Sequence, residues 1–298
     1  MNARDTSFQS HEIEEHSVQS NVVAQTFKIK VKQPISRADG SERFPVLYAT
    51  DSDDFFGGLA TVASVLQVLG EAPRFILVGI GYDDARAAGV LRMRDFYTHA
   101  TRRLFQAEIE QMAVSPLVGG VADLKAITQT TDATEFLHFI RDDLMPFVAA
   151  HYPVLPNDYN YYGYSAGAGF GLYTLFAQPD TFRRYILGSP GTSYNGHHFG
   201  IEMAKAFMKS GQAMDAKVFI SVGEFEEFKR GHGQFDLVTG YYLLAKFLKQ
   251  SDIPGLDLTL RLFPGETHAT AWTLAFSHGV RTLFGAVDQV PFWPKFLK

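Results

Sequence analysis

Apolar runs alternate with segments of helical periodicity along most of this chain. The continuous apolar run Phe75–Ile80 is typical of a strand that is buried on both faces. Apolar residues recur at helical spacing from Glu135 to Tyr152, and Pro146 is expected to kink or divide that helix. The same patterns predict strands at 185–188, 217–222 and 256–262, and helices at 59–69, 201–209, 241–248 and 271–284. Strands that alternate with helices predict an α/β fold, with a largely parallel sheet covered by helices on both faces.

The N-terminal region follows a different pattern. Residues 22–31 partly alternate between apolar residues and lysine, which predicts a strand with one solvated face. Turn-forming residues separate it from a second strand at 44–49, so we expect an antiparallel hairpin. Residues 1–20 are polar and aperiodic, and we expect a flexible arm there. No repeat or low-complexity linker divides residues 21–298, which predicts a single domain, with the charged segment Arg92–Asp95 in a loop.

Composition excludes several classes of function. Hydrophobic residues make up 46% of the 298 positions, enough for a sizeable core, and the net charge of −5 argues against nucleic acid or an anionic membrane as partner. There is no cysteine, so disulfides, thiolate catalysis and cysteine-ligated metals are excluded. The N-terminus lacks the apolar segment of a secretory signal, and no apolar run approaches the ~18 residues of a membrane span. We therefore expect a soluble, cytoplasmic protein.

The segment Asn160–Leu172 carries the clearest catalytic motif. Its centre, Gly163-Tyr164-Ser165-Ala166-Gly167, fits the G-x-S-x-G nucleophile elbow, in which a serine lies on a tight turn between a strand and a helix. Aromatic residues precede the motif, and a run of small residues follows it. Small residues suit such a turn because the strand and the helix close tightly around the strained serine. Ser165 is therefore the predicted nucleophile.

A serine hydrolase also needs a histidine base and a carboxylate, in the chain order serine, acid, histidine. Downstream of Ser165, the predicted strand 217–222 is followed by an acidic loop, and the strand 256–262 is followed by a loop that contains His268. His268 would accept the serine proton, the carboxylate would fix the histidine tautomer, and backbone N–H groups would bind the oxyanion. The pattern leaves the acid open among three neighbours, Glu224, Glu226 and Glu227.

Other motifs are weaker, and we expect neither a cofactor nor a metal. Gly79-Ile80-Gly81 begins like a dinucleotide fingerprint, but Asp84 stands where its third glycine is required. His11 and His16 are five positions apart rather than four, which places them on different faces of a helix and argues against a zinc site. The pair His197-His198 fits a surface loop better than a substrate pocket.

Several blocks of sequence carry a resemblance to a known family. They are Phe44-Pro45-Val46-Leu47-Tyr48 with Asp51, Phe75–Ile80 with Arg92-Met93-Arg94-Asp95, Phe139–Phe147, Gly188-Ser189-Pro190, Gly223–Glu226 and Gly265–His268. Together they resemble the putative-esterase (esterase D-like) branch of the α/β-hydrolases, from about Phe27 to Phe284. That branch includes siderophore trilactone esterases, feruloyl esterases and S-formylglutathione hydrolases, and mycolyltransferases are related to it.

The resemblance implies an α/β-hydrolase fold and further site residues. The family motif G-x-x-D/E falls on residues 223–226 and points to Glu226 as the acid. The family's oxyanion loop implies that the backbone N–H groups of Ala166 and Ser52 form the oxyanion hole. Ser52 stands where many members have glycine. Some siderophore esterases of the family work with serine and histidine alone.

We therefore predict a serine esterase that hydrolyses a small-molecule carboxylic ester through an acyl-enzyme, with Ser165, His268 and Glu226 as its triad. Arg92 or Arg94 is a candidate contact for a substrate carboxylate or hydroxyl, with a structural salt bridge as the alternative. Tyr164 is a further candidate for substrate binding. Two other functions would fit the same residues, an acyltransferase with the same triad and a binding protein that has lost the chemistry. The substrate and the oligomeric state stay open.

Overall fold

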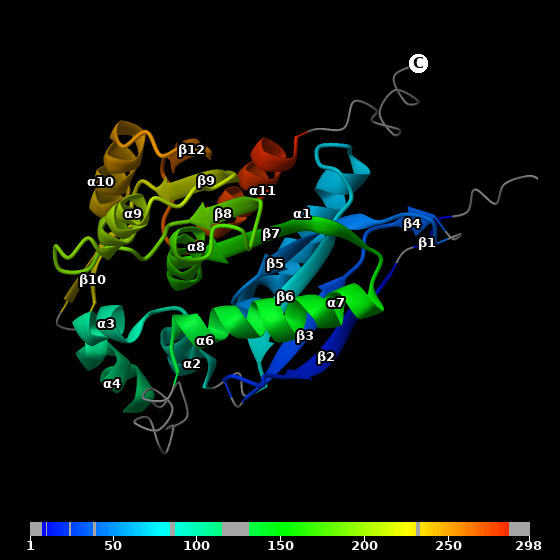
Figure 1. The fold of residues 1–298 in the computed structure, drawn as a ribbon, viewed down its shortest axis with the longest axis horizontal. Coiled ribbons are helices and arrows are strands. Elements are labelled where there is room, and N and C mark those ends of the chain that lie inside the picture. Colours follow the sequence, from blue (N-terminus) through cyan, green and yellow to red (C-terminus); the bar gives the residue numbers. More distant parts are fainter. Residues whose placement is uncertain are drawn as a thin grey trace, which may run out of the picture.

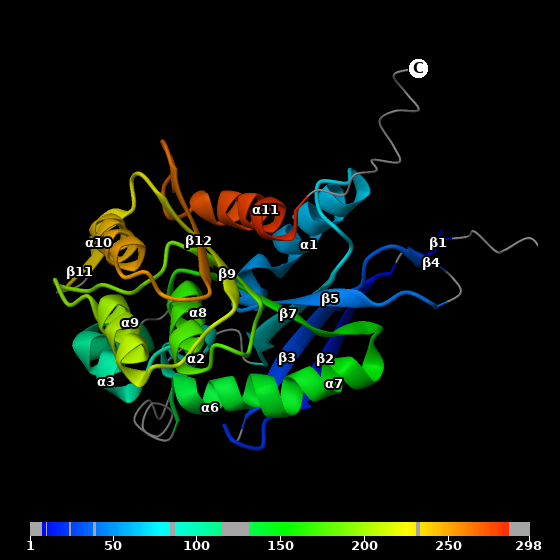
Figure 2. The ribbon, with the colours of Figure 1, turned by 45° about the horizontal axis from the view of Figure 1, so that its top comes forward.

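The structure is a computed structural model that describes residues 8–9, 11–23, 25–37, 40–83, 87–114, 131–230 and 233–285. These residues form three layers, a central sheet with helices packed on each of its faces (Figure 1 and Figure 2). Within the part of the chain that is described, no helix is both long enough and apolar enough to cross a membrane.

The central sheet has eight strands in the order β12-β9-β8-β7-β5-β6-β3-β2. Their bounds are β2 Ile13–Gln19, β3 Thr26–Lys32, β5 Phe44–Ala49, β6 Ile76–Tyr82, β7 Val154–Tyr164, β8 Arg184–Gly188, β9 Ala216–Gly223 and β12 Leu256–Phe263. Neighbours from β12 to β6 pair in parallel, whereas β3 pairs antiparallel with β6 and with β2. Two small antiparallel pairs flank this sheet, β1 (Phe8–Gln9) with β4 (Ser36–Arg37) and β10 (Glu227–Arg230) with β11 (Gly233–Asp236). The predicted sheet, largely parallel with antiparallel strands at its N-terminal end, is confirmed.

Two groups of helices cover the two faces of the sheet. Helices α1 (Ser52–Val68) and α11 (Ala271–Phe284) pack on one face. The other face is covered by α2 Ala88–Asp95, α3 His99–Arg102, η1 Arg103–Phe105, α4 Gln106–Val114, α6 Ala133–His138, η2 Phe139–Leu144, α7 Met145–His151, α8 Ala166–Ala177, α9 Phe199–Ser210 and α10 Leu237–Gln250. Strand side chains alternate between these two cores. In β5, Val46 and Tyr48 join the core with α8, whereas Leu47 and Ala49 join the core with α1 and α11.

Long periodic segments formed the predicted elements. All residues of β6 are buried, as its continuous apolar sequence indicated. The helix predicted over 135–152 consists of α6, the π-helical turn η2 and α7, and Pro146 lies in the first turn of α7. Proline cannot donate the backbone hydrogen bond of a helix interior, which explains why a regular α-helix does not run through this point.

The predicted N-terminal hairpin is wrong in its partners. The strand within 22–31 is β3, which pairs with β2 and β6, while β5 pairs with β6 and β7. Strand β6 therefore lies between the two strands that were expected to pair. A local pattern identifies a strand but not its neighbours, and β6, which separates β3 from β5, comes from a later part of the chain.

The flexible arm expected over residues 1–20 is wrong for β2, which forms an edge strand. Val18 is the one buried residue of β2. The sequence of this segment therefore lacks the alternation of apolar and polar residues that predicts a strand. Its backbone pairs along the whole of β3, with Glu15 directly opposite Lys30. The His16 ring also hydrogen-bonds to the Tyr152 hydroxyl. Backbone pairing with β3 and the contact of His16 with Tyr152 hold this strand. Residues 1–7 and 10 lie outside the described residues.

The loop expected at Arg92–Asp95 is also wrong, because these residues form the last turn of α2. The Arg94 guanidinium bonds the Asp95 carboxylate, with 2.6 Å between Nε and Oδ1. Arg94 and Asp95 are 5% and 0% exposed. A charged segment of sequence usually indicates solvent exposure, but these two side chains are buried and paired with each other.

Candidate active site

Ser165 lies between β7 and α8 in a strained backbone conformation. Its φ of 56° and ψ of −119° are rare for any residue other than glycine and cost roughly 1–3 kcal/mol. Three backbone hydrogen bonds hold it. The Ser165 N–H donates to the Gly188 carbonyl (2.9 Å), and the Ser165 carbonyl accepts from the N–H groups of Gly169 and Gly191 (3.0 Å each). The strand, turn and helix predicted around this serine are confirmed.

Two glycines of the motif allow the elbow to close. A Cβ atom on Gly163 would lie 2.4 Å from the backbone of Gly167, and a Cβ atom on Gly167 would lie 2.3 Å from Thr50 Oγ1. Any side chain at either position would therefore collide with its surroundings. The second contact also shows that the turn after β5 packs against the start of α8.

His268 and Glu226 are brought together from two loops. Glu226 follows β9, and His268 lies between β12 and α11. His268 Nδ1 bonds Glu226 Oε2 at 2.8 Å, and the Glu226 side chain is fully buried while that of His268 is 32% exposed. An Nδ1–H donated to a buried carboxylate leaves the basic lone pair on Nε2, which is the tautomer that a general base requires.

The other two glutamates of the acidic loop bind elsewhere. The Glu224 carboxylate accepts the Gly265 N–H at 2.8 Å. The Glu227 carboxylate accepts the N–H groups of Val238 and Thr239 in the first turn of α10, where a negative charge is favoured by the helix dipole. Both side chains belong to exposed residues. Of the three candidates, Glu226 is the one that contacts His268.

Two groups besides His268 make close hydrogen bonds to Glu226, and neither had a role in the predicted site, while the Tyr164 hydroxyl is a more distant donor at 3.5 Å. Ser189 Oγ donates to Glu226 Oε1 at 2.8 Å, and the Gly223 N–H donates to the same oxygen at 2.7 Å. Ser189 has a φ of +49° and is 1% exposed. The signal in the sequence was its position directly after the strand 185–188, beside the strand that leads to the acid.

Tyr164 supports the His268 loop. Its ring lies 4.9 Å from the His268 ring, centroid to centroid, and its hydroxyl donates to the His268 carbonyl at 2.8 Å. Burial, followed by the nearby Glu226 carboxylate, raises the pKa of Tyr164 well above its ordinary value. The hydroxyl therefore stays protonated as a donor. A contact between Tyr164 and substrate stays a prediction.

The residues predicted for the oxyanion hole begin two helices at the same edge of the sheet. Ala166 is the first residue of α8 and Ser52 is the first residue of α1. Strands β5 and β7 pair in register with Ala49 opposite Tyr162, so the two helices, which pack on opposite faces of the sheet, begin after neighbouring strand ends. N–H groups in the first turn of a helix have no acceptor within the helix and favour anions. The oxyanion role of these two groups stays a prediction.

Arg92 is engaged by Asp51 in the turn before α1. Its Nε donates to Asp51 Oδ1 at 2.7 Å and its Nη2 to Oδ2 at 2.9 Å. Burial lowers the pKa of Arg92, but the Asp51 carboxylate outweighs burial and raises it above the ordinary value. Arg92 and Arg94 thus both form the structural salt bridges that the sequence analysis named as the alternative. Direct contact of Arg92 with substrate stays a prediction.

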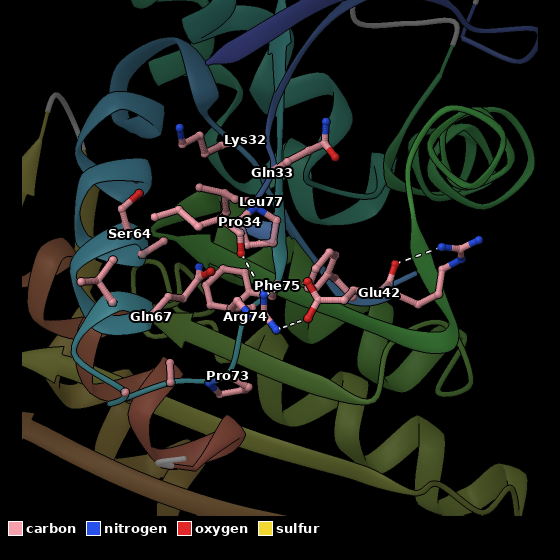
Figure 3. Close-up of a pocket in the computed structure, with 17 residues that line it drawn as sticks. Lys32, Gln33, Pro34, Glu42, Ser64, Gln67, Pro73, Arg74, Phe75 and Leu77 are labelled. Carbon is pink, nitrogen blue, oxygen red and sulfur yellow. Dashed lines mark hydrogen bonds and ion pairs between the residues drawn. The ribbon is translucent and has the colours of Figure 1, made fainter. Parts of the chain in front are cut away.

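A separate cavity of about 790 Å³ lies at the opposite ends of the strands from Ser165. Figure 3 shows its lining, with Arg74 hydrogen-bonded to Glu42 in the wall. Phe44 begins β5 and Phe75 precedes β6, so the cavity lies at the amino ends of these strands, whereas Ser165 and His268 follow carboxyl ends. It is therefore not part of the candidate active site. Among the described residues, no group of three histidine or carboxylate side chains is placed to hold a metal ion.

Comparisons with known proteins identify a family and two relatives. The family described as “Putative esterase” matches residues 118–283. The ferri-bacillibactin esterase BesA of Bacillus subtilis is 26% identical over 266 residues, which are 86% of this chain and 84% of that protein. The siderophore triacetylfusarinine C esterase of Aspergillus fumigatus is 26% identical over 284 residues, 87% of this chain and 88% of that protein.

Solved structures share the fold. The BES protein from Bacillus cereus superposes with a TM-score of 0.72 and 22% identity, over 96% of this chain and all of that chain. An IroE-like serine hydrolase from Shewanella oneidensis superposes with a TM-score of 0.69 and 18% identity, over 92% of this chain and 80% of that chain. The α/β-hydrolase fold expected from the sequence motifs is confirmed.

Proposed function

The chain belongs to the “Putative esterase” family, and on that premise we propose that it hydrolyses carboxylic esters through an acyl-enzyme formed on Ser165. The observation that carries this proposal is the bond between His268 and the buried Glu226, at the same sheet edge as the strained elbow of Ser165. Esterase chemistry belongs to the family, whereas the assignment of these three residues to the triad is our proposal.

The reaction would proceed in two stages. Ser165 Oγ attacks the ester carbonyl while His268 Nε2 takes the serine proton, and the histidine then gives that proton to the departing alcohol. A water molecule next loses its proton to His268 and attacks the acyl-enzyme. The acid product leaves and Ser165 recovers its proton. Glu226 would keep the imidazole oriented and stabilise its charged form.

The negative charge of each tetrahedral intermediate needs donors that are already in place. The N–H groups of Ala166 and Ser52, at the starts of α8 and α1, are our proposed donors. Losing one such donor typically costs about 10²–10³ in kcat. The N-terminal ends of two helices would add favourable dipoles at the same point.

We propose siderophore esters as the substrate class. Two relatives that each align over more than four fifths of this chain are named as siderophore esterases. A panel of siderophore, feruloyl, thioester and simple acyl esters, compared by kcat/KM, tests this class. A clear preference for the feruloyl or thioester substrates would contradict it.

Labelling with a fluorophosphonate probe tests the proposed chemistry. We expect one adduct, located at Ser165 by peptide mass mapping. The Ser165→Ala variant should take no label and should lose ~10³-fold or more of its turnover of a short p-nitrophenyl ester. An unlabelled wild-type protein, or a labelled Ser165→Ala variant, would refute Ser165 as the nucleophile.

A further inference from the structure

Arg92 and Asp51 form a bidentate ion pair beside the proposed oxyanion site. Both hydrogen bonds are short, at 2.7 and 2.9 Å, and the Asp51 side chain is 4% exposed. The guanidinium also lies 5.5 Å from the centre of the Phe96 ring. A planar guanidinium matches a carboxylate at two points, so it fixes both the position and the orientation of Asp51.

The turn that Arg92 holds determines where α1 begins. Asp51 has φ 57° and ψ 39°, the left-handed region that residues other than glycine seldom adopt. Its carbonyl accepts the N–H groups of Asp54 and Phe55, so this residue starts the helix. The backbone of Asp51 therefore sets the direction of the Ser52 N–H that follows it.

The Asp51 carboxylate also lies against the nucleophile elbow. A Cβ atom on Gly167 would be 3.0 Å from Asp51 Oδ2, which places this oxygen beside the first turn of α8. The Ala166 N–H belongs to the same turn. An unpaired negative charge here would oppose the negative charge of an oxyanion, and the opposite charge of Arg92 cancels it.

We propose that Arg92 is a positioning residue that acts on the reaction through Asp51. It holds the turn that presents the Ser52 N–H, and it neutralises the carboxylate next to the oxyanion. This inference rests on the proposed serine esterase function. It assigns Arg92 no contact with substrate.

Steady-state kinetics on a short p-nitrophenyl ester test the proposal with three variants. Arg92→Ala should lower kcat by about 10² or more, with KM changed less than about threefold, because a transition-state interaction is lost. The double variant Asp51→Asn with Arg92→Ala should recover at least about tenfold in kcat, since asparagine tolerates the left-handed backbone and carries no charge. Arg92→Lys keeps the positive charge but cannot bind the carboxylate at two points, so its kcat should fall between the wild-type and Arg92→Ala values.

A matched control is available at the far edge of the sheet. Arg74 also makes a bidentate pair, with Glu42, and Arg74→Ala should leave kcat within about twofold, because this half-buried pair lies away from the proposed site. Thermal unfolding of each variant separates loss of fold from loss of positioning. If Arg92→Ala does not fold, Arg92→Lys carries the test, with a lower kcat at nearly unchanged KM as the expected result.

Two results would overturn the proposal. One is an unchanged kcat for Arg92→Ala or Arg92→Lys, and a rise in KM beside it would indicate direct substrate contact. The other is a double variant with a kcat no higher than that of Arg92→Ala. A wild-type protein with neither esterase turnover nor a fluorophosphonate adduct would instead refute the proposed function itself, so the two failures are distinguishable.

Discussion

Glu226 is a buried carboxylate whose three closest hydrogen-bond partners come from three strand ends. Ser189 follows β8, Gly223 ends β9, and His268 follows β12. A buried charge is retained only when it is paired or hydrogen-bonded, and each hydrogen bond to a charged group contributes about 1.5–3 kcal/mol. These partners explain why Glu226 can stay inside while Glu224 and Glu227 remain at the surface.

Replacing Glu226 by glutamine should slow the reaction far more than the same change at Glu224. Glutamine keeps the size of the side chain but cannot stabilise a charged imidazole, and an equivalent change in a known triad costs about 10⁴ in kcat. Glu224→Gln should change kcat by less than about threefold, as for an exposed position. The measurement is kcat on a short p-nitrophenyl ester, and equal or reversed losses would refute Glu226 as the acid.

The elbow of β7 and α8 is the element that carries the nucleophile. Its strain at Ser165 is sustained by backbone hydrogen bonds to the strand β8 and the loop after it. Tyr161 of β7 adds a further tie, because its hydroxyl donates to the Gly167 carbonyl at 2.7 Å. The position of Ser165 therefore depends on the packing of neighbouring elements as much as on its own motif.

Gly163 has no room for a side chain, whereas Gly57 has. Gly163→Ala would place a Cβ atom 2.4 Å from the Gly167 backbone, so we expect loss of fluorophosphonate labelling and a lower melting temperature. Gly57 lies in α1, and a Cβ atom added there would meet nothing within 4 Å. Gly57→Ala should therefore stabilise the protein, by roughly 0.5–1 kcal/mol in urea unfolding. Full labelling of Gly163→Ala would contradict the assigned elbow geometry.

At the scale of the whole molecule, the parallel sheet gathers the site. Asp51, Ser165, Ser189, Glu226 and His268 follow β5, β7, β8, β9 and β12, and these strands are consecutive in the sheet. Figure 1 shows these strands side by side. The carboxyl ends of parallel strands meet at one edge, where ligands commonly bind in open α/β sheets. Residues more than two hundred positions apart therefore reach one place.

Stability should also depend on pH through His278, away from the site. Burial, then the charges of Arg261 and Arg281, lowers the pKa of His278 below its ordinary value. The unfolded chain therefore binds the proton more readily, and this contribution to stability is lost as pH falls from about 6.5 through the folded-state pKa. His278→Gln should lose less stability than the wild type between pH 7.5 and 5.0, measured by urea unfolding. Identical losses would contradict this linkage.

By itself, the sequence determined the segments whose pattern of apolar, polar and small residues reflects how they are buried. The apolar run of β6, the helix interrupted at Pro146 and the small residues of the elbow each carry a local physical signature. The order of serine, acidic loop and histidine could also be read directly, because it is a property of the chain. The same motifs supported the family resemblance that the comparisons confirmed.

The tertiary structure alone decided which residues meet. It inserted β6 between β3 and β5, and it made β2 an edge strand. It also brought Glu226 rather than Glu224 to His268, and it paired Arg92 with Asp51. Such contacts join residues that are distant in the chain, whereas periodicity reports only whether a segment buries one of its own faces. The partners in the site therefore became visible only when the sheet had placed them at a common edge.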